Sequence, residues 1–180
     1  PCIELDEVPS DKKNICVSRS FGNMIDSLEI LEQSLSTHAN SASEKLRKQN
    51  SNTSSISVFL QTNRFRNDLP QYFSSKVVDL EFPTNDSGNI INAALTGLNL
   101  IFREGFKYKK CGIFINEITP ANDVQLNLFV EDDSEKKNKL NKAVDVLNGK
   151  FGRGTLKYAV QGYKNEWKLR QENLSKSFTT

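Results

Sequence analysis

The residues of this chain that could do covalent chemistry do not form a catalytic pattern. The three closest carboxylates, Glu131, Asp132 and Asp133, are consecutive, so their side chains diverge. A two-metal site instead needs carboxylates that converge from separate strands. The single histidine, His38, falls within a helical pattern and has no serine or cysteine nucleophile paired with it. We therefore expect no catalytic residue in this chain.

Phosphate-loop and metal motifs are missing as well. Gly152 and Gly154 have neither the spacing of a glycine-rich phosphate loop nor the Lys-Ser/Thr pair that follows one. The cysteines are odd in number and far apart, which predicts free thiols in a reducing cytoplasm rather than disulfides or a zinc site: Cys2, Cys16 and Cys111. We expect no metal and no cofactor to be bound by these residues.

The charge of the chain is small in total but unevenly placed. The net charge is +2, yet residues 1–11 carry four acids and no base, while residues 134–180 carry eleven Lys or Arg against four acids. Such a basic tail is typical of proteins with an anionic partner such as nucleic acid, although a solvated basic helix would look the same. No apolar run is long enough to span a bilayer and no signal peptide is visible, so we expect a cytoplasmic protein without a membrane partner.

Hydrophobic periodicity predicts the order strand, helix, strand, strand, helix, strand. The first helix is expected at about 26–48 with Asp26 as its N-cap, and the second begins after Asp86 or Ser87 and ends before Gly105. The order indicates an α+β fold, a four-stranded antiparallel-type sheet with two helices on one face. The predicted strands cover residues 14–20, 54–63, 75–82 and 109–118.

A small α/β extension is expected after this domain. Its helix is predicted over 134–148, with Ser134 as a cap and Gly149 following its last turn. A short strand is predicted over 155–161. The predicted apolar stripe of the helix consists of Leu140, Ala143, Val144 and Leu147.

The sheet face away from the helices is predicted to carry small polar and basic side chains: Ser18, Ser20, Ser57, Gln61, Lys76, Lys110 and Asn116. Hydroxyls, amides and lysines suit phosphate oxygens, and further basic residues gather at strand ends. An ordinary solvated face, with Asp79 and Glu81 as its acids, is the alternative. We expect the phosphates of an anionic partner such as nucleic acid to be bound by Ser18, Arg19, Ser20, Ser57, Gln61, Arg64, Lys76, Lys109 and Lys110.

A pentapeptide at 125–129, Gln-Leu-Asn-Leu-Phe, presents apolar side chains in what should be a surface connector. It resembles the short peptide by which bacterial polymerases and repair proteins hold the sliding clamp. In that family Gln enters a small polar pocket, and Leu and Phe fill a hydrophobic one. A short edge strand is the alternative. The expected clamp-binding residues are Gln125, Leu126, Leu128 and Phe129.

Six short pieces in order along the chain, at 1–5, 18–22, 83–86, 125–129, 152–155 and in the tail from Trp167 to Thr180, carry a wider resemblance. Together they resemble the C-terminal region of UmuC-like Y-family translesion DNA polymerases. One departure is Lys176, which stands where the family has Pro. The chain also opens on Pro1 rather than Met, as a piece of a longer protein would.

The resemblance implies a division into a lead-in from the thumb (1–12), a DNA-binding little finger (13–118), a linker with the clamp motif (119–132) and a C-terminal extension of undefined role (133–180). It places the catalytic palm and the Mg²⁺ ligands upstream of Pro1, so these residues are not expected to be an enzyme on their own. It implies as partners template-primer DNA, the bacterial beta sliding clamp, a UmuD-type accessory dimer and a RecA filament, in the SOS response to DNA damage.

Two other functions fit the same order of elements. An RNA-binding ferredoxin-like module stacks bases on aromatic residues of its central strands, but the usual Lys/Arg-Gly-Phe run is missing from residues 76–80. An acyl-phosphate hydrolase on this fold would need an Arg–Asn site in a glycine loop, which the sequence does not contain.

Overall fold

The computed structural model describes residues 11–121, 134–164 and 166–169. Residues 1–10 of the predicted lead-in, the clamp motif at 125–129 and residues 170–180 of the tail lie outside these residues. None of the helices in these ranges combines the length and the hydrophobicity that a membrane-spanning helix needs.

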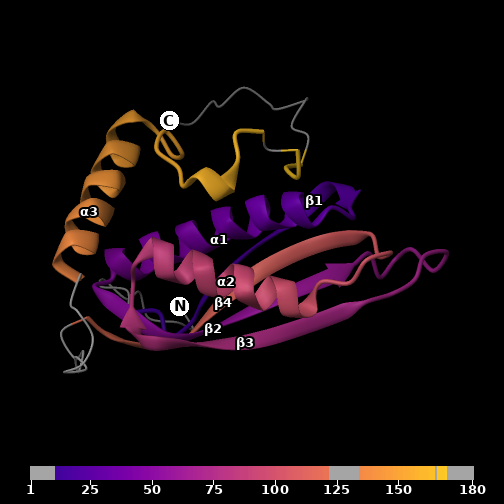
Figure 1. The fold of residues 1–180 in the computed structure, drawn as a ribbon, viewed down its shortest axis with the longest axis horizontal. Helices are drawn as coiled ribbons and strands as arrows, with labels where there is room; N and C mark the ends of the chain where they lie inside the picture. The colour runs from indigo at the N-terminus through magenta and orange to yellow at the C-terminus, as the bar shows by residue number, and fades with distance from the viewer. Residues whose placement is uncertain (1–10, 122–133, 165, 170–180) are drawn as a thin grey trace, which may run out of the picture.

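A four-stranded antiparallel sheet forms the centre of the fold, in the order β1-β4-β2-β3. Two helices, α1 (Leu28–Lys48) and α2 (Ser87–Ile101), lie across one face of the sheet and leave the other face open (Figure 1). The predicted α+β architecture is confirmed. The strands are β1 (Ile15–Ile25), β2 (Ser51–Thr62), β3 (Phe73–Thr84) and β4 (Tyr108–Pro120).

The hydrophobic core lies between the two helices and the covered face of the sheet. Along β2, the alternating residues Ile56, Val58 and Leu60 are fully buried, as their period of two predicts. The helices contribute buried apolar residues at three- and four-residue steps, which places them on one side of each helix. These include Leu31, Leu35, Ala39, Ala42, Leu46, Ile91, Ala94 and Leu98.

The two covering helices begin differently. The side chain of Asp86 caps α2 by accepting a hydrogen bond from the backbone N–H of Asn89 at 2.8 Å, as predicted. The N-cap of α1 is Ser27 and not Asp26, so that prediction is wrong, and the Ser27 side chain makes no capping bond. Burial of its apolar stripe, rather than a cap, therefore stabilises α1.

Strand β1 is longer than its sequence pattern predicts. The prediction ended it at Ser20, but the strand continues to Ile25 with a bulge between Ser20 and Ile25. The reason is burial, because Phe21 and Ile25 both enter the core. A bulge lets a strand bend while its side chains still reach the core.

The C-terminal extension contains helix α3 (Ser134–Phe151) and a short 3-10 helix, η1 (Ala159–Gln161). Two predictions are wrong here: α3 runs through Gly149, and residues 155–161 do not form a strand. The predicted apolar stripe of α3 is also largely exposed, with Leu140 and Leu147 both open to solvent. Hydrogen bonds of polar side chains hold α3 against the sheet domain instead. For example, the side-chain amide of Asn141 donates to the Asp86 carboxylate at 2.7 Å.

The end of the described chain packs back onto the domain. The segment after η1 runs over α1 (Figure 1) and places Trp167 in the core at 3% exposure. The Trp167 ring packs edge-on against the His38 ring, with the two ring centroids 5.4 Å apart. The Trp167 backbone carbonyl accepts a hydrogen bond from the N–H of Gly22 at 3.3 Å. A Cβ on Gly22 would lie 2.7 Å from the Lys168 carbonyl oxygen, so a glycine is needed there. The extension thus completes the core of the sheet domain.

Candidate nucleic-acid interface

The open face of the sheet can be read as rows of side chains from the strand register. Residues directly opposite each other on neighbouring strands point to the same face. One row contains Ser20, Lys110, Gln61 and Phe73, and the next contains Ser18, Gly112, Phe59 and Ser75. A third contains Cys16, Phe114, Ser57 and Val77, and a fourth contains Asn116, Ser55 and Asp79.

Five of the predicted DNA-binding residues share this open face: Ser18, Ser20, Ser57, Gln61 and Lys110. The Ser57 hydroxyl oxygen accepts from the Asn116 amide at 2.7 Å, which leaves its hydrogen available for another acceptor. A face with hydroxyl donors and a lysine can bind phosphate oxygens.

Two predicted residues lie on the other face. Lys76 pairs with Val58, and Arg19 pairs with Cys111, and both partners are fully buried under the helices. The prediction that Lys76 points away from the helices is therefore wrong. Both residues are exposed because β1 and β3 are the edge strands. Neither residue is therefore part of the rows on the open face.

Among the remaining basic residues, Lys109 and Arg66 already have hydrogen-bond or ion-pair partners for their charged groups. The ammonium group of Lys109 donates to the carbonyl of Phe21 at 2.6 Å and to that of Gly22 at 3.4 Å, so it supports the β1 bulge. Arg66 pairs with Asp68 at 2.6 Å, and this hydrogen bond lowers the pKa of the Asp68 carboxyl to about 2. Neither side chain is free to bind a ligand without giving up its partner.

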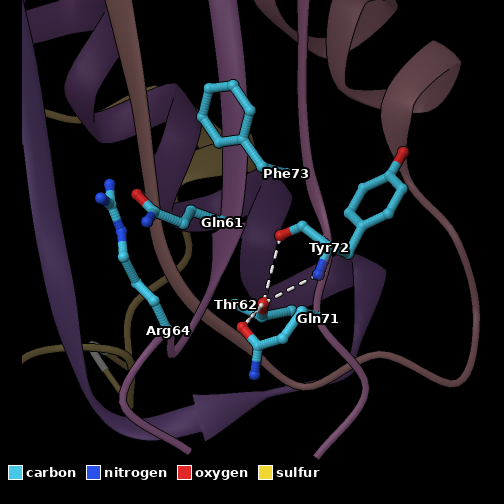
Figure 2. Close-up of a pocket in the computed structure, with 6 residues that line it drawn as sticks. All are labelled: Gln61, Thr62, Arg64, Gln71, Tyr72 and Phe73. Carbon is cyan, nitrogen blue, oxygen red and sulfur yellow. Dashed lines mark hydrogen bonds between the residues drawn. The ribbon is translucent and has the colours of Figure 1, made fainter. Parts of the chain in front are cut away.

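Arg64 lies beside a pocket of about 440 Å³ at the hairpin end of β2 and β3. With the Gln61 amide turned so that its oxygen faces the guanidinium, this oxygen accepts from Arg64 Nη2 at 2.9 Å and from Nε at 2.6 Å. Figure 2 shows these two side chains next to each other, with the Phe73 ring pointing away from the bonded pair Thr62 and Tyr72. Because Gln61 is neutral, it holds the guanidinium without cancelling its charge.

Sequence reasoning placed Phe59 on the face opposite the core but did not include any aromatic residue of the open face among the candidate binding residues. Phe59 and Phe114 lie on the two central strands, with ring centroids 5.4 Å apart. The ammonium group of Lys110 is 5.9 Å from the Phe59 ring centroid. The signal was present in the sequence, because Phe114 alternates with the buried residues Ile113 and Ile115 and must therefore face the other way.

The titratable groups of the core are held neutral. Burial raises the pKa of the Cys111 thiol to about 12. Burial, aided by the nearby charge of Arg19, lowers the pKa of His38 to about 4. In the described part of the chain, no group of three His, Cys, Asp or Glu side chains could hold a metal ion.

Comparison with known proteins assigns the chain to a family. The model described as the impB/mucB/samB family C-terminal domain matches residues 12–128. The chain belongs to this family. A second model, described as a domain of unknown function (DUF4113), matches residues 138–180. The impB/mucB/samB domain thus includes the whole sheet, α1 and α2, while most of α3 and Trp167 belong to the second match.

Relatives agree over the full chain. UmuC from Salmonella typhimurium is 39% identical over 182 residues, which is 100% of this chain and 43% of that protein. ImpB from the same species is 37% identical over 180 residues, and MucB from Escherichia coli is 35% identical over 182 residues; each match covers 99% of this chain and 42% of the relative. The predicted resemblance to UmuC-like proteins is confirmed, and the chain spans less than half the length of these relatives.

Two solved structures show a weaker likeness. One is an insertion ternary complex of Dbh DNA polymerase, with a TM-score of 0.48 and 14% identity over 59% of this chain and 29% of that one. The other is a complex of the beta-clamp processivity factor and the little finger domain of PolIV, with a TM-score of 0.42 and 18% identity over 65% of this chain and 99% of that one.

Proposed function

We propose that this chain is the DNA-binding and clamp-tethering C-terminal region of a UmuC-like translesion DNA polymerase. Membership of the impB/mucB/samB family supports a translesion polymerase as the longer protein to which this chain belongs. The polar and basic residues of the open face support DNA as the ligand. The observation that carries the proposal is the row in which Ser20, Lys110 and Gln61 lie side by side, next to Arg64. These groups donate to phosphate oxygens irrespective of base sequence.

The DNA-binding part is tested by titrating the chain with labelled duplexes at several salt concentrations. Each phosphate neutralised contributes roughly 0.9 to the slope of log affinity against log salt. Lys110→Ala should weaken binding and flatten the slope by about that amount. Lys142→Ala, an exposed lysine of α3, is the matched control and should leave duplex affinity nearly unchanged. Strong dependence on base sequence at fixed salt, or no effect of Lys110→Ala, contradicts backbone binding.

The clamp-binding part rests on the sequence of residues 125–129, which the structure does not describe. Burying a Leu or Phe side chain contributes roughly 1.5–3 kcal/mol, so two anchors and a bonded Gln support about micromolar affinity after ordering costs. Leu128→Ala combined with Phe129→Ala should abolish binding to purified bacterial beta clamp and leave duplex affinity intact. Asn127→Ala is the control within the same peptide. Unchanged clamp affinity of the double variant, or its unfolding, would favour the edge-strand alternative.

The whole protein is proposed to act in the SOS response in the cytoplasm, with a UmuD-type dimer and a RecA filament as partners. Polymerisation and its Mg²⁺ ions are assigned to residues of the parent that precede this chain. Purified chain should therefore incorporate no nucleotide on a primed template with any divalent metal. Primer extension that survives rigorous purification contradicts this assignment.

A further inference from the structure

Three phenylalanines form a diagonal line across the open face. Phe114 lies on β4 opposite Ser57, Phe59 lies on β2 opposite Ser75, and Phe73 lies on β3 opposite Gln61. Each ring is thus one strand over and one row along from the previous one. Diagonal neighbours of this kind are about 7–8 Å apart, within reach of aromatic side chains. The line joins the sheet centre to the pocket at the β2–β3 hairpin.

The rings at the two ends of the diagonal are open to solvent, while the middle ring forms its floor. Phe73 is 64% exposed and Phe114 is also exposed, whereas Phe59 is only 7% exposed. Phe59 lies over Gly112, where an added Cβ would approach its ring atoms to 2.6 Å. Val77 adds a further exposed apolar side chain beside Ser57. A contiguous apolar patch rimmed by polar groups marks an interaction surface.

The charges around the diagonal favour an anionic occupant. Lys110 and Arg64 flank the end at which Phe73 lies, and within the described residues neither of them forms an ion pair. The nearest carboxylate of the face, Asp79, lies in the fourth row, beyond Val77 and away from the cations. A partner with planar apolar groups and a negative backbone therefore fits this surface better than an apolar protein segment does.

The pocket beside Phe73 is held in shape by its own hydrogen bonds. The side-chain amide of Gln71 donates to three backbone carbonyls of the hairpin loop, and the Thr62 hydroxyl accepts from the N–H of Tyr72 at 2.9 Å. These bonds leave Arg64 and the Phe73 ring as the groups available to a ligand (Figure 2). A pocket with one exposed ring and one guanidinium can receive a single base and its phosphate.

We infer that the Phe114–Phe59–Phe73 diagonal binds unpaired single-stranded nucleic acid, with bases stacked on Phe73 and Phe114 and phosphates against Lys110 and Arg64. The inference rests on the proposed function, since it uses the same open face. It adds a preference for unpaired strands. In an intact duplex the faces of the bases are already stacked on each other, so exposed rings gain nothing from them. Stacking of this kind is tolerant of base identity, because every base has a π-face.

The test uses the full chain and four labelled probes of equal length, about twelve nucleotides, set by the site size of single-strand-binding sheets. The probes are oligo-dT, oligo-rU, a duplex, and an abasic DNA strand that has the same phosphates without bases. The variants are Phe73→Ala and Phe114→Ala. Leu100→Ala is the matched control, because Leu100 has the same 64% exposure as Phe73 but lies on α2. Thermal unfolding of each variant verifies that it is folded.

Each phenylalanine variant should bind oligo-dT about 5- to 100-fold more weakly than the parent chain. Its affinities for the duplex and for the abasic strand should be unchanged, and Leu100→Ala should bind all probes like the parent chain. Tighter binding of oligo-rU than oligo-dT would assign the stacking surface to RNA, and the reverse to DNA.

The stacking inference is overturned if both phenylalanine variants bind oligo-dT as well as the unsubstituted chain does. It is also overturned if the variants lose as much affinity for the abasic strand as they lose for oligo-dT. Either result can occur while Lys110→Ala still weakens duplex binding, so the inference can fail while the proposed function stands. If Lys110→Ala leaves duplex affinity unchanged while the phenylalanine variants still weaken oligo-dT binding, the duplex-binding proposal is contradicted and the stacking inference stands.

Discussion

Arg47 on α1 and Asp145 on α3 form a bidentate ion pair, with Nε–Oδ2 at 2.7 Å and Nη2–Oδ1 at 2.8 Å. The Arg47 side chain is 11% exposed and that of Asp145 is 30% exposed. The third guanidinium nitrogen donates to the Asn85 carbonyl at 2.8 Å and the Ser87 hydroxyl at 3.0 Å. One side chain therefore joins α1, the start of α2 and the C-terminal extension.

Asp145→Asn should lower the free energy of unfolding, because it leaves a largely buried guanidinium without its counter-charge. Removing one partner of a fully buried pair costs roughly 3–5 kcal/mol, and partial exposure reduces the expected loss to about 1–3 kcal/mol. Urea unfolding followed by circular dichroism measures it. Glu135→Gln removes an exposed acid of the same helix, paired with Lys139 at 3.7 Å, and should change stability by less than about 1 kcal/mol. Equal midpoints for the two variants would show that α3 is not anchored by Arg47.

Trp167→Ala should destabilise the sheet domain, although Trp167 lies in the extension. The indole is buried against His38 and the α1 side of the core, so its removal leaves a cavity and should cost about 3–5 kcal/mol. Trp167→Phe should cost less, because the indole N–H has no hydrogen-bond partner to lose among the described residues. The exposed aromatic Tyr163 supplies the control Tyr163→Ala. A sheet domain whose hydrogen exchange is unaffected by Trp167→Ala would mean that the extension folds separately.

The central strands could be predicted because their alternation matches burial residue by residue. Ile56, Val58 and Leu60 on β2 and Ile113 and Ile115 on β4 all face the core as expected. The same rule would have placed Lys76 correctly, since it lies two residues from Val78 and must share its face. Its charge suggested an outward side chain, but an edge strand lets a covered-face lysine reach solvent.

The extension could not be predicted from periodicity. The stripe containing Leu140 and Leu147 indicated a buried helix face, yet α3 docks through Asn141 and Asp145. Their partners, Asp86 and Arg47, are far away in the sequence, so no local sequence pattern predicts these hydrogen bonds. The same holds for Trp167, whose place in the core depends on a close backbone approach to β1.

Stability should fall in acid partly through His38. Burial lowers its pKa in the folded state to about 4, from the ordinary value of 6.5 in the unfolded chain. The unfolded state therefore binds more protons between these values, so the stability that His38 contributes is complete above pH 6.5 and is lost as the pH falls to about 4. At about 1.4 kcal/mol per pKa unit the loss is on the order of 3 kcal/mol.

His38→Phe keeps a ring against Trp167 and removes the titration. Its unfolding free energy should decline less than that of the parent chain over this pH window, as urea midpoints at half-unit pH steps would show. Carboxylates that titrate in the same window act equally on both proteins. Parallel curves for the two would mean that His38 is protonated without cost in the folded state.

Gly112→Ala tests whether the geometry of the open face depends on a missing side chain. Its Cβ would overlap the Ser18 Cβ and approach the Phe59 ring to 2.6 Å. Both neighbours are held by the sheet, so the ring must move, and overpacking of this kind costs about 1–3 kcal/mol.

The same glycine-to-alanine change at Gly149 in α3 meets nothing within 4 Å and should stabilise the helix by up to about 1 kcal/mol. Displacing the Phe59 ring should also alter its contact with Phe114, so aromatic NMR shifts of both rings should change in Gly112→Ala and not in Gly149→Ala. If Gly112→Ala is as stable as the parent chain with unchanged aromatic shifts, the Phe59 ring does not lie on the β4 backbone.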